Sequence, residues 1–224
     1  MNVLITGAGR GIGLALTRAF LNDGHSVLAV SRNIEELNKI GNANLTAYSF
    51  DLLNNDFTPL LEKVSKTFIK LDILINNAGM LIVKPLLEFS DADFDKLFNV
   101  NVKAAYKMVR GCVPLMNQGS HIVNISSIGG FQGSVKFPGL ALYSASKGAL
   151  AVLTESMAIE LADEKISVNA LALGAVQTEM LSAAFPEYKA PLQPDEMASF
   201  IKYFALSGHK VYNGKILPVS LSTP

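Results

Sequence analysis

Short apolar runs alternate with helical patterns along most of this chain, and this alternation limits the possible folds more than any other feature. The runs are nearly continuous in apolar residues, which is typical of strands buried on both faces of a parallel sheet. The predicted strands are Val3–Ile5, Ser26–Ser31, Leu45–Phe50, Leu71–Ile75, His121–Ile125 and Ser167–Leu173. The predicted helices are Leu14–Leu21, Ile34–Ile40, Thr58–Ile69, Asp91–Met116 and Leu142–Ala162. Because crossovers between parallel strands are right-handed, the sequence predicts an α/β fold with a doubly wound parallel sheet in three layers, α/β/α.

The composition predicts a globular chain with a large core. Half of the 224 residues are hydrophobic and 17% are charged, so residues 1–224 are expected to form a single domain. Nineteen basic residues balance nineteen acidic ones without a dense basic stripe, so neither a nucleic acid nor an anionic membrane is expected as a partner. Strand-like sequence begins at Asn2, and no uncharged apolar run approaches the length of a membrane span. With the lone Cys112, these features predict a cytoplasmic protein.

No metal site is predicted. His25, His121 and His209 lie in turn-like or strand-edge positions without the spacing of metal ligands.

Glycines follow the first predicted strand directly and open the first helix. Gly7, Gly11 and Gly13 give the spacing Gly-x-x-x-Gly-x-Gly, with Ile12 where the common Gly-x-Gly-x-x-Gly pattern has glycine. Backbone N–H groups and the helix dipole at such a turn can receive a pyrophosphate, because no side chain blocks its approach. A glycine-rich connector without a ligand is the alternative. The position at the first strand-to-helix turn favours a dinucleotide site, and makes the fold Rossmann-like.

The end of the second strand indicates which dinucleotide is bound. A sheet that selects NAD usually has a carboxylate here, whereas this chain has Ser31 and Arg32, with Arg10 inside the glycine turn. Two guanidinium groups can bind a 2′-phosphate, so NADP(H) is favoured over NAD(H). The alternative is that both arginines are merely solvated. Asp51, with Leu52 after it, ends the third strand; its carboxylate could accept the adenine amino group or cap the next turn.

Tyr143 and Lys147 lie four residues apart in a predicted helix, so their side chains share a face. A free phenol has a pKa near 10, and bringing it near 7 requires about 4 kcal/mol. One ammonium about 5 Å away supplies roughly 3 kcal/mol at an effective dielectric of 20. The positive charge of an oxidised nicotinamide could supply the rest. The pair therefore predicts a tyrosine that acts as a general acid or base.

Several motifs occur in the order seen in one enzyme family. The chain resembles the short-chain dehydrogenase/reductase family from Asn2 to about Gly214. The matching pieces are Thr6–Gly13, Asp51, Asn76–Gly79, Asn101, Ser127, Tyr143 with Lys147, and Gly174 with Thr178. The resemblance implies an NADP(H)-dependent oxidoreductase that interconverts a small-molecule carbonyl and a secondary alcohol by hydride transfer.

The resemblance also implies roles for single residues. Tyr143 would exchange the proton with the substrate oxygen, which Ser127 would orient. Lys147 would lower the pKa of the tyrosine and hold the nicotinamide ribose. Asn101 would position a water that passes protons to this lysine, although a purely structural asparagine is the alternative. The implied cofactor contacts are Gly7, Arg10, Gly11, Ile12, Gly13, Ser31, Arg32, Asp51, Leu52, Asn77, Ala78, Gly79, Tyr143, Lys147, Gly174, Val176 and Thr178.

The chain departs from the family pattern at three places. Tyr143 lies sixteen positions after Ser127, a longer spacing than is usual, so Ser126 or Ser127 could be the working hydroxyl, and Ser127 is favoured. Leu173 replaces the usual proline, and the substrate loop, about residues 179–194, is short. The tail lacks the familiar Asp-Gly-Gly ending.

Two further expectations concern function and assembly. A non-catalytic NADP-binding sensor or scaffold of the same fold is the alternative function. The helices at 91–116 and 142–162 resemble a pair that forms a four-helix dimer interface in the family, so a homodimer or homotetramer is expected.

Overall fold

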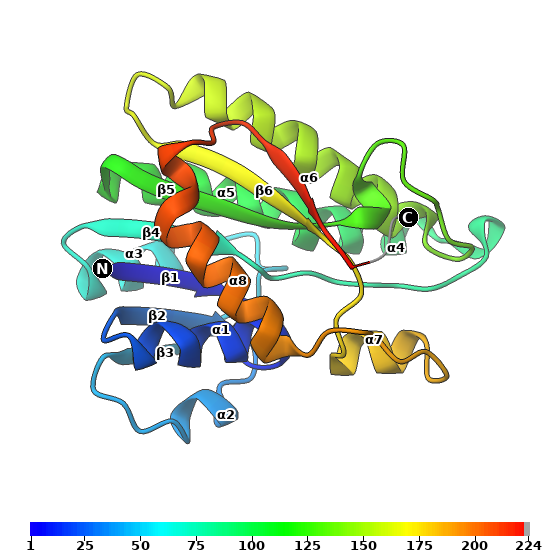
Figure 1. The fold of residues 1–224 in the computed structure, drawn as a ribbon, viewed down its shortest axis with the longest axis horizontal. Helices are drawn as coiled ribbons and strands as arrows, with labels where there is room; N and C mark the ends of the chain where they lie inside the picture. Colours follow the sequence, from blue (N-terminus) through cyan, green and yellow to red (C-terminus); the bar gives the residue numbers. More distant parts are fainter. Residues whose placement is uncertain (222–224) are drawn as a thin grey trace.

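A parallel sheet forms the centre of the molecule in the computed structural model, which describes residues 1–221 (Figure 1). In this part of the chain the strand order is β3-β2-β1-β4-β5-β6-β7, and every neighbouring pair is parallel. The order reverses between β1 and β4, where the chain first crosses to the other half of the sheet. The strands are β1 (Asn2–Thr6), β2 (Ser26–Ser31), β3 (Leu45–Ser49), β4 (Leu71–Asn76), β5 (Met116–Ser127), β6 (Ser167–Leu173) and β7 (Ile216–Val219).

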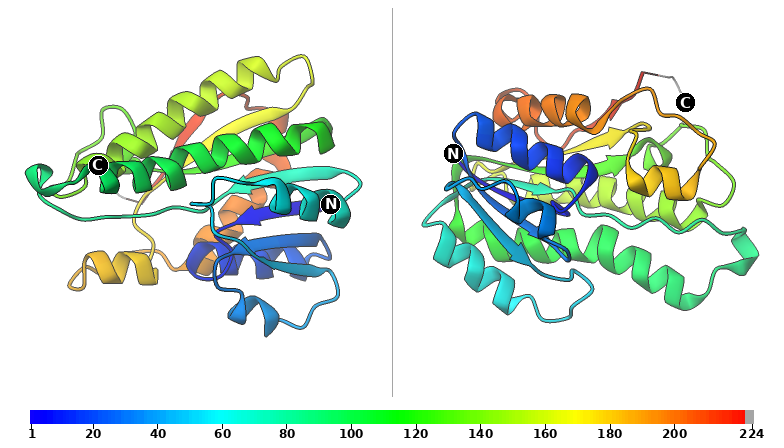
Figure 2. Two further views of the ribbon diagram at one scale, coloured as in Figure 1. Left: turned by 180° about the vertical axis from the view of Figure 1, so that it is seen from behind. Right: turned by 90° about the horizontal axis from the view of Figure 1, so that it is seen from below.

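Helices cover both faces of the sheet and complete the three layers (Figure 2). The α-helices are α1 (Gly11–Asn22), α2 (Glu35–Asn38), α3 (Thr58–Thr67), α4 (Asp91–Phe98), α5 (Ala104–Cys112), α6 (Ala141–Glu160), α7 (Glu179–Ala184) and α8 (Pro194–Ser207). Alternate residues of β1 point to different cores, because side chains along a strand alternate between the two faces of a sheet. Ile5 packs with α1 and α8, whereas Leu4 packs with α3, α5 and α6. The predicted doubly wound, Rossmann-like sheet is confirmed.

The predicted helix at 91–116 is interrupted in the structure. A π-helical segment, η2 (Asn99–Lys103), separates α4 from α5, and a 3-10 turn, η3 (Val113–Leu115), precedes β5. Such π segments arise where an extra residue is accommodated in the helix, and they are frequent at functional sites. Hydrophobic periodicity cannot reveal this, because the apolar face continues through the interruption.

Helices α7 and α8 and strand β7 are not predicted from the sequence, and β5 is longer than predicted. The start of α8 does carry a local signal: Gln193 and Glu196 form a reciprocal capping box and Pro194 is the first helical residue. The sequence gives β7 little signal, since it has only four residues and contains Pro218.

Two properties of the described residues bear on function. None of the helices within residues 1–221 is long and apolar enough to span a bilayer. Cys112 is buried in α5, and burial raises the pKa of its thiol to about 12, so this cysteine serves packing.

Candidate functional site

The glycine turn joins β1 to α1 with a geometry that other residues could not adopt. Gly7 and Gly11 have φ of +66° and +52°, and a Cβ on Gly7 would lie 2.7 Å from the Cα of Ala78. Asn77 holds the turn against β4, because its Nδ2 donates to the carbonyl oxygens of Thr6 and Gly7 at 3.0 and 3.1 Å. The peptide N–H of Ala78 donates to Thr6 Oγ1 at 3.2 Å. The turn is therefore a tight backbone cradle.

The helix α1 itself supplies neither a capping side chain nor a negative charge to its first turn. Its N-cap residue, Arg10, makes no side-chain capping hydrogen bond, and the turn contains no acidic residue. A Cβ on Gly13 would collide with the carbonyl oxygen of Gly7, so only a residue without a side chain fits at this position. Open N–H groups at a helix N-terminus are suited to a pyrophosphate. The residues present thus fit a dinucleotide cofactor.

The residues expected to select the cofactor lie beside this turn. Gly9 packs against Ser31, since a Cβ on Gly9 would lie 2.5 Å from the serine Oγ. Arg10 and Arg32 are exposed, and neither forms an ion pair with any residue that the structure describes. The carboxylate of Asp51 accepts the N–H of Leu53 at 3.0 Å, which is the turn-capping arrangement. Leu52 lines a small internal cavity of about 10 Å³.

The two serines at the end of β5 have different environments. Ser126 is buried, and its hydroxyl donates to the carbonyl oxygen of Lys147 at 2.9 Å, which fixes α6 to the sheet. Ser127 is partly exposed; its Oγ accepts the N–H of Gly129 at 3.2 Å and lies close enough to the Tyr143 phenol to affect its pKa. Ser127 is therefore the hydroxyl that can reach a substrate beside the phenol.

Lys147 is buried directly beneath Tyr143. Only 3% of the lysine is exposed, and its Nζ donates to the carbonyl oxygen of Ile125 at 2.7 Å. Nζ lies 6.0 Å from the centre of the Tyr143 ring. A Cβ on Gly79 would lie 3.4 Å from Nζ, so this glycine leaves room for the ammonium. Burial lowers the pKa of Lys147 to about 8.

Tyr143 has a raised pKa in this structure, because burial outweighs the hydrogen bond from Ser127, which lowers the pKa. The four-residue spacing instead predicts that Lys147 lowers the pKa of the tyrosine. The difference has a physical reason: the lysine is itself desolvated, and its ammonium donates a hydrogen bond to the carbonyl oxygen of Ile125. A neutral phenol is the form that can donate a proton.

Asn101 lies in the π segment and is 1% exposed. Its Oδ1 accepts the N–H of Met80 at 2.7 Å, and its Nδ2 donates to Met80 O at 3.0 Å and to Ser146 Oγ at 2.9 Å. The side chain therefore links the segment after β4 to α6. Met80 and Ser146 cannot be identified as partners from the sequence, because neither forms a motif.

The segment after β6 completes the site. Gly174 donates its N–H to the carbonyl oxygen of Val219 at 2.8 Å, and Val176 is buried. Thr178 caps α7, since its Oγ1 accepts the N–H of Leu181 at 3.2 Å. The Thr178 methyl group lies 3.3 Å from the position of a Cβ on Gly11. This threonine is therefore next to the glycine turn.

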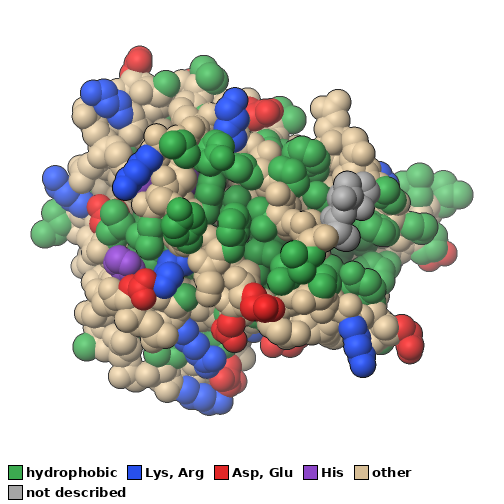
Figure 3. Space-filling view, viewed as in Figure 1, with side chains coloured by type: hydrophobic (Ala, Val, Ile, Leu, Met, Phe, Trp, Pro, Cys, Tyr) green, Lys and Arg blue, Asp and Glu red, His purple; other side chains and the backbone are tan. Residues whose placement is uncertain are grey.

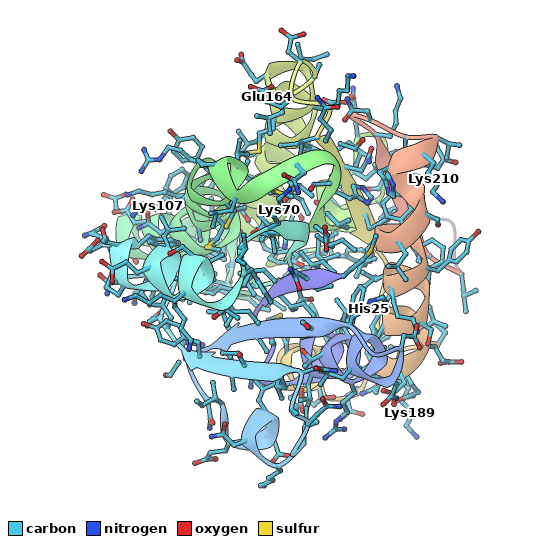
Figure 4. All side chains as sticks on the ribbon, turned by 90° about the vertical axis from the view of Figure 1, so that its left-hand side faces the viewer. His25, Lys70, Lys107, Glu164, Lys189 and Lys210 are labelled. Carbon is cyan, nitrogen blue, oxygen red and sulfur yellow. The ribbon has the colours of Figure 1, made fainter. Side chains whose placement is uncertain are left out.

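These segments meet at one end of the sheet, where the carboxyl ends of β1, β4, β5 and β6 lie. Figure 4 looks onto the opposite end, where the labelled His25 and Lys70 directly precede β2 and β4. Among residues 1–221, no group of three or more His, Cys, Asp or Glu side chains could hold a metal ion. In doubly wound sheets, ligands bind at the carboxyl ends of the strands, close to the reversal of strand order. Fold and site together define a dinucleotide-binding α/β protein with a Ser-Tyr-Lys group beside the nucleotide turn.

Comparison with known proteins identifies the family. Residues 1–189 match the family model for short chain dehydrogenases, so this chain belongs to the short-chain dehydrogenase/reductase family of oxidoreductases. It is 33% identical to the 3-oxoacyl-[acyl-carrier-protein] reductase FabG of Rickettsia prowazekii, over 97% of this chain and 94% of that protein. An oxidoreductase of Staphylococcus aureus is 30% identical, over 89% of this chain and 88% of the relative.

Solved structures of relatives contain nicotinamide cofactors. A 4-hydroxyisoleucine dehydrogenase mutant complexed with NADH and succinate superposes with a TM-score of 0.88 at 28% identity, over 98% of this chain and 96% of that chain. A short chain dehydrogenase from Burkholderia cenocepacia in complex with NADP gives a TM-score of 0.85 at 26% identity, over 97% of this chain and 95% of that chain. These relatives therefore bind either NADH or NADP.

Proposed function

We propose that this protein is an NADP(H)-dependent oxidoreductase that interconverts a small-molecule carbonyl and a secondary alcohol, with Tyr143 as the general acid or base. The observation that carries the proposal is the placement of the Ser127 hydroxyl beside the Tyr143 phenol, with Lys147 buried beneath the ring. This group lies at the carboxyl ends of the strands that also hold the glycine turn. The lone, buried Cys112 suits a reducing compartment, so we place the protein in the cytoplasm.

The residues of the site suit a proton transfer coupled to hydride transfer. The nicotinamide cofactor supplies or accepts the hydride when it is bound. In the direction of reduction, Tyr143 donates its proton to the carbonyl oxygen and Ser127 holds that oxygen by a hydrogen bond. Lys147, with a pKa of about 8, can exchange protons near neutral pH and thereby restore the tyrosine proton. Asn101 keeps the backbone of Met80 and the Ser146 hydroxyl in place around this lysine.

Replacement of Tyr143 by phenylalanine tests the reaction. Tyr143→Phe removes the phenol hydroxyl but keeps the ring, so NADPH binding should persist while turnover falls by about 10²- to 10⁴-fold. Nicotinamide absorbance is followed with a panel of diketones, quinones and aldehydes. Turnover that survives in Tyr143→Phe would contradict the assignment. NADPH binding without turnover of any substrate by the wild type would favour the alternative, a non-catalytic NADP-binding sensor.

A second experiment tests the cofactor preference. Arg32→Ala should weaken NADPH binding by roughly tenfold and leave NADH binding nearly unchanged, because only NADPH has the 2′-phosphate. Affinities are measured by titration of nicotinamide fluorescence. Arg18→Ala, which changes an exposed arginine further along α1, is the matched control. Equal losses for both cofactors in Arg32→Ala would refute the preference for NADP(H).

A further inference from the structure

The carboxylate of Glu179 lies against the glycine turn. A Cβ placed on Gly11 would lie 3.6 Å from Oε2 of Glu179, although the two residues are far apart in the sequence. Glu179 is the first residue of α7, which lies beyond the end of the sheet to which the strand arrowheads point (Figure 1). Thr178, immediately before it, is close to the same glycine, because its methyl group lies 3.3 Å from the position of a Cβ on Gly11. The fold therefore brings a negative charge to the start of α1.

The start of α1 is a favourable place for that charge. The helix has twelve residues, no side-chain cap and no acidic residue in its first turn, so its N-terminal N–H groups and dipole lack a negative partner from the helix itself. The Glu179 carboxylate forms no hydrogen bond or ion pair with other residues in the described part of the chain. Among these residues, the carboxylate is therefore not committed to another partner.

We propose that Glu179 is an internal competitor of the cofactor pyrophosphate, and that it sets the affinity of this protein for its nicotinamide cofactor. The inference rests on the proposed function, because it places the pyrophosphate at the glycine turn. Before binding, the carboxylate provides negative charge at the start of α1. On binding, the pyrophosphate takes over that role, and the carboxylate has to move away or remain beside a second negative group.

The competitor role of Glu179 predicts a different effect on the affinities for NADPH and NADH than the role proposed for Arg32. NADPH and NADH both contain the pyrophosphate, so Glu179 should lower the affinity for both by the same factor. It should leave the ratio of the two affinities unchanged, whereas an arginine at the 2′-phosphate changes that ratio. Because the side chain is exposed, salt should weaken the effect.

The experiment compares Glu179→Gln with the wild type by two measurements. Titration of NADPH and of NADH should give dissociation constants about three- to tenfold lower in the variant, with a smaller gain at 0.5 M salt. The cofactor-free variant should unfold about 1–3 °C lower, because α1 loses a negative charge at its N-terminus. Glu187→Gln, an exposed position in the connection from α7 to α8, is the matched control and should change neither quantity.

The outcomes separate this inference from the proposed function. Unchanged or weaker binding of both cofactors by Glu179→Gln would overturn the competitor role. A gain restricted to NADPH would overturn it as well, because the effect would then lie at the 2′-phosphate. If the wild-type protein bound neither NADPH nor NADH, the proposed function itself would fail.

Discussion

At the residue scale, the chemical role proposed for Lys147 is accompanied by a cost in stability. Its pKa is about 8 in the folded protein, against an ordinary value of 10.5, because burial disfavours the charged form. Below pH 8 the lysine is protonated in both the folded and the unfolded state, and the difference of 2.5 pKa units corresponds to about 3 kcal/mol of lost stability. Between pH 8 and 10.5 the unfolded state binds more protons, so this penalty diminishes as the pH rises.

Lys147→Met should therefore stabilise the protein at pH 7 while abolishing turnover. We expect the free energy of unfolding to rise by about 2 kcal/mol. The gain is smaller than the full penalty, because the carbonyl oxygen of Ile125 loses its hydrogen bond. The melting-temperature difference between variant and wild type should shrink as the pH rises from 8 to 10.5. Lys70→Met, at an exposed lysine, is the control. A difference that does not depend on pH would contradict the buried charge.

At the element scale, the interruption between α4 and α5 places one buried amide at the junction of three segments. Asn101 in η2 binds the backbone of Met80, which follows β4, and the hydroxyl of Ser146 in α6. This asparagine therefore has a structural role that is independent of any proton relay. Its hydrogen bonds also stabilise the π segment, although the hydrophobic periodicity of this part of the chain favours a continuous helix.

Asn101→Ala should destabilise the protein substantially. The change leaves the N–H and carbonyl of Met80 and the Ser146 hydroxyl without their partner in a buried region, so we expect a loss of about 2–4 kcal/mol in the free energy of unfolding. Urea denaturation followed by circular dichroism measures this loss. Asn38→Ala, at an exposed position of α2, should change stability by less than about 0.5 kcal/mol. Similar values for the two variants would refute the structural role.

At the scale of the whole molecule, large apolar side chains are exposed on two faces. On α6, Val152 and Ile159 are 63% and 79% exposed, and they lie seven residues apart on one side of the helix. On the opposite face of the sheet, Tyr203 of α8 is 70% exposed, and Figure 3 shows hydrophobic side chains gathered on this face. Exposed apolar patches of this kind mark association surfaces.

We therefore predict that the protein is at least a dimer through α5 and α6. Light scattering coupled to size-exclusion chromatography should give a mass of at least twice 24.0 kDa for the wild type. Val152→Glu should shift the protein to the monomer, because it places a charge in the proposed interface. Tyr203→Glu on α8 is the matched variant on the other face and should leave the α5–α6 dimer intact. A single 24.0 kDa wild-type species at micromolar concentration would exclude this prediction.

Features that depend on local spacing could be predicted from the amino-acid sequence. The strand-helix alternation, the positive-φ glycines after β1 and the four-residue spacing of Tyr143 and Lys147 are all readable locally, because periodicity and backbone conformation are short-range properties. Features that depend on burial and on contacts with distant residues are visible only in the tertiary structure. In the fold, the Ser126 hydroxyl binds the backbone of α6, whereas Ser127 lies beside the phenol. Burial lowers the pKa of Lys147, and Glu179 comes close to Gly11. Desolvation and contacts between remote segments arise only when the whole chain folds, so no local pattern encodes them.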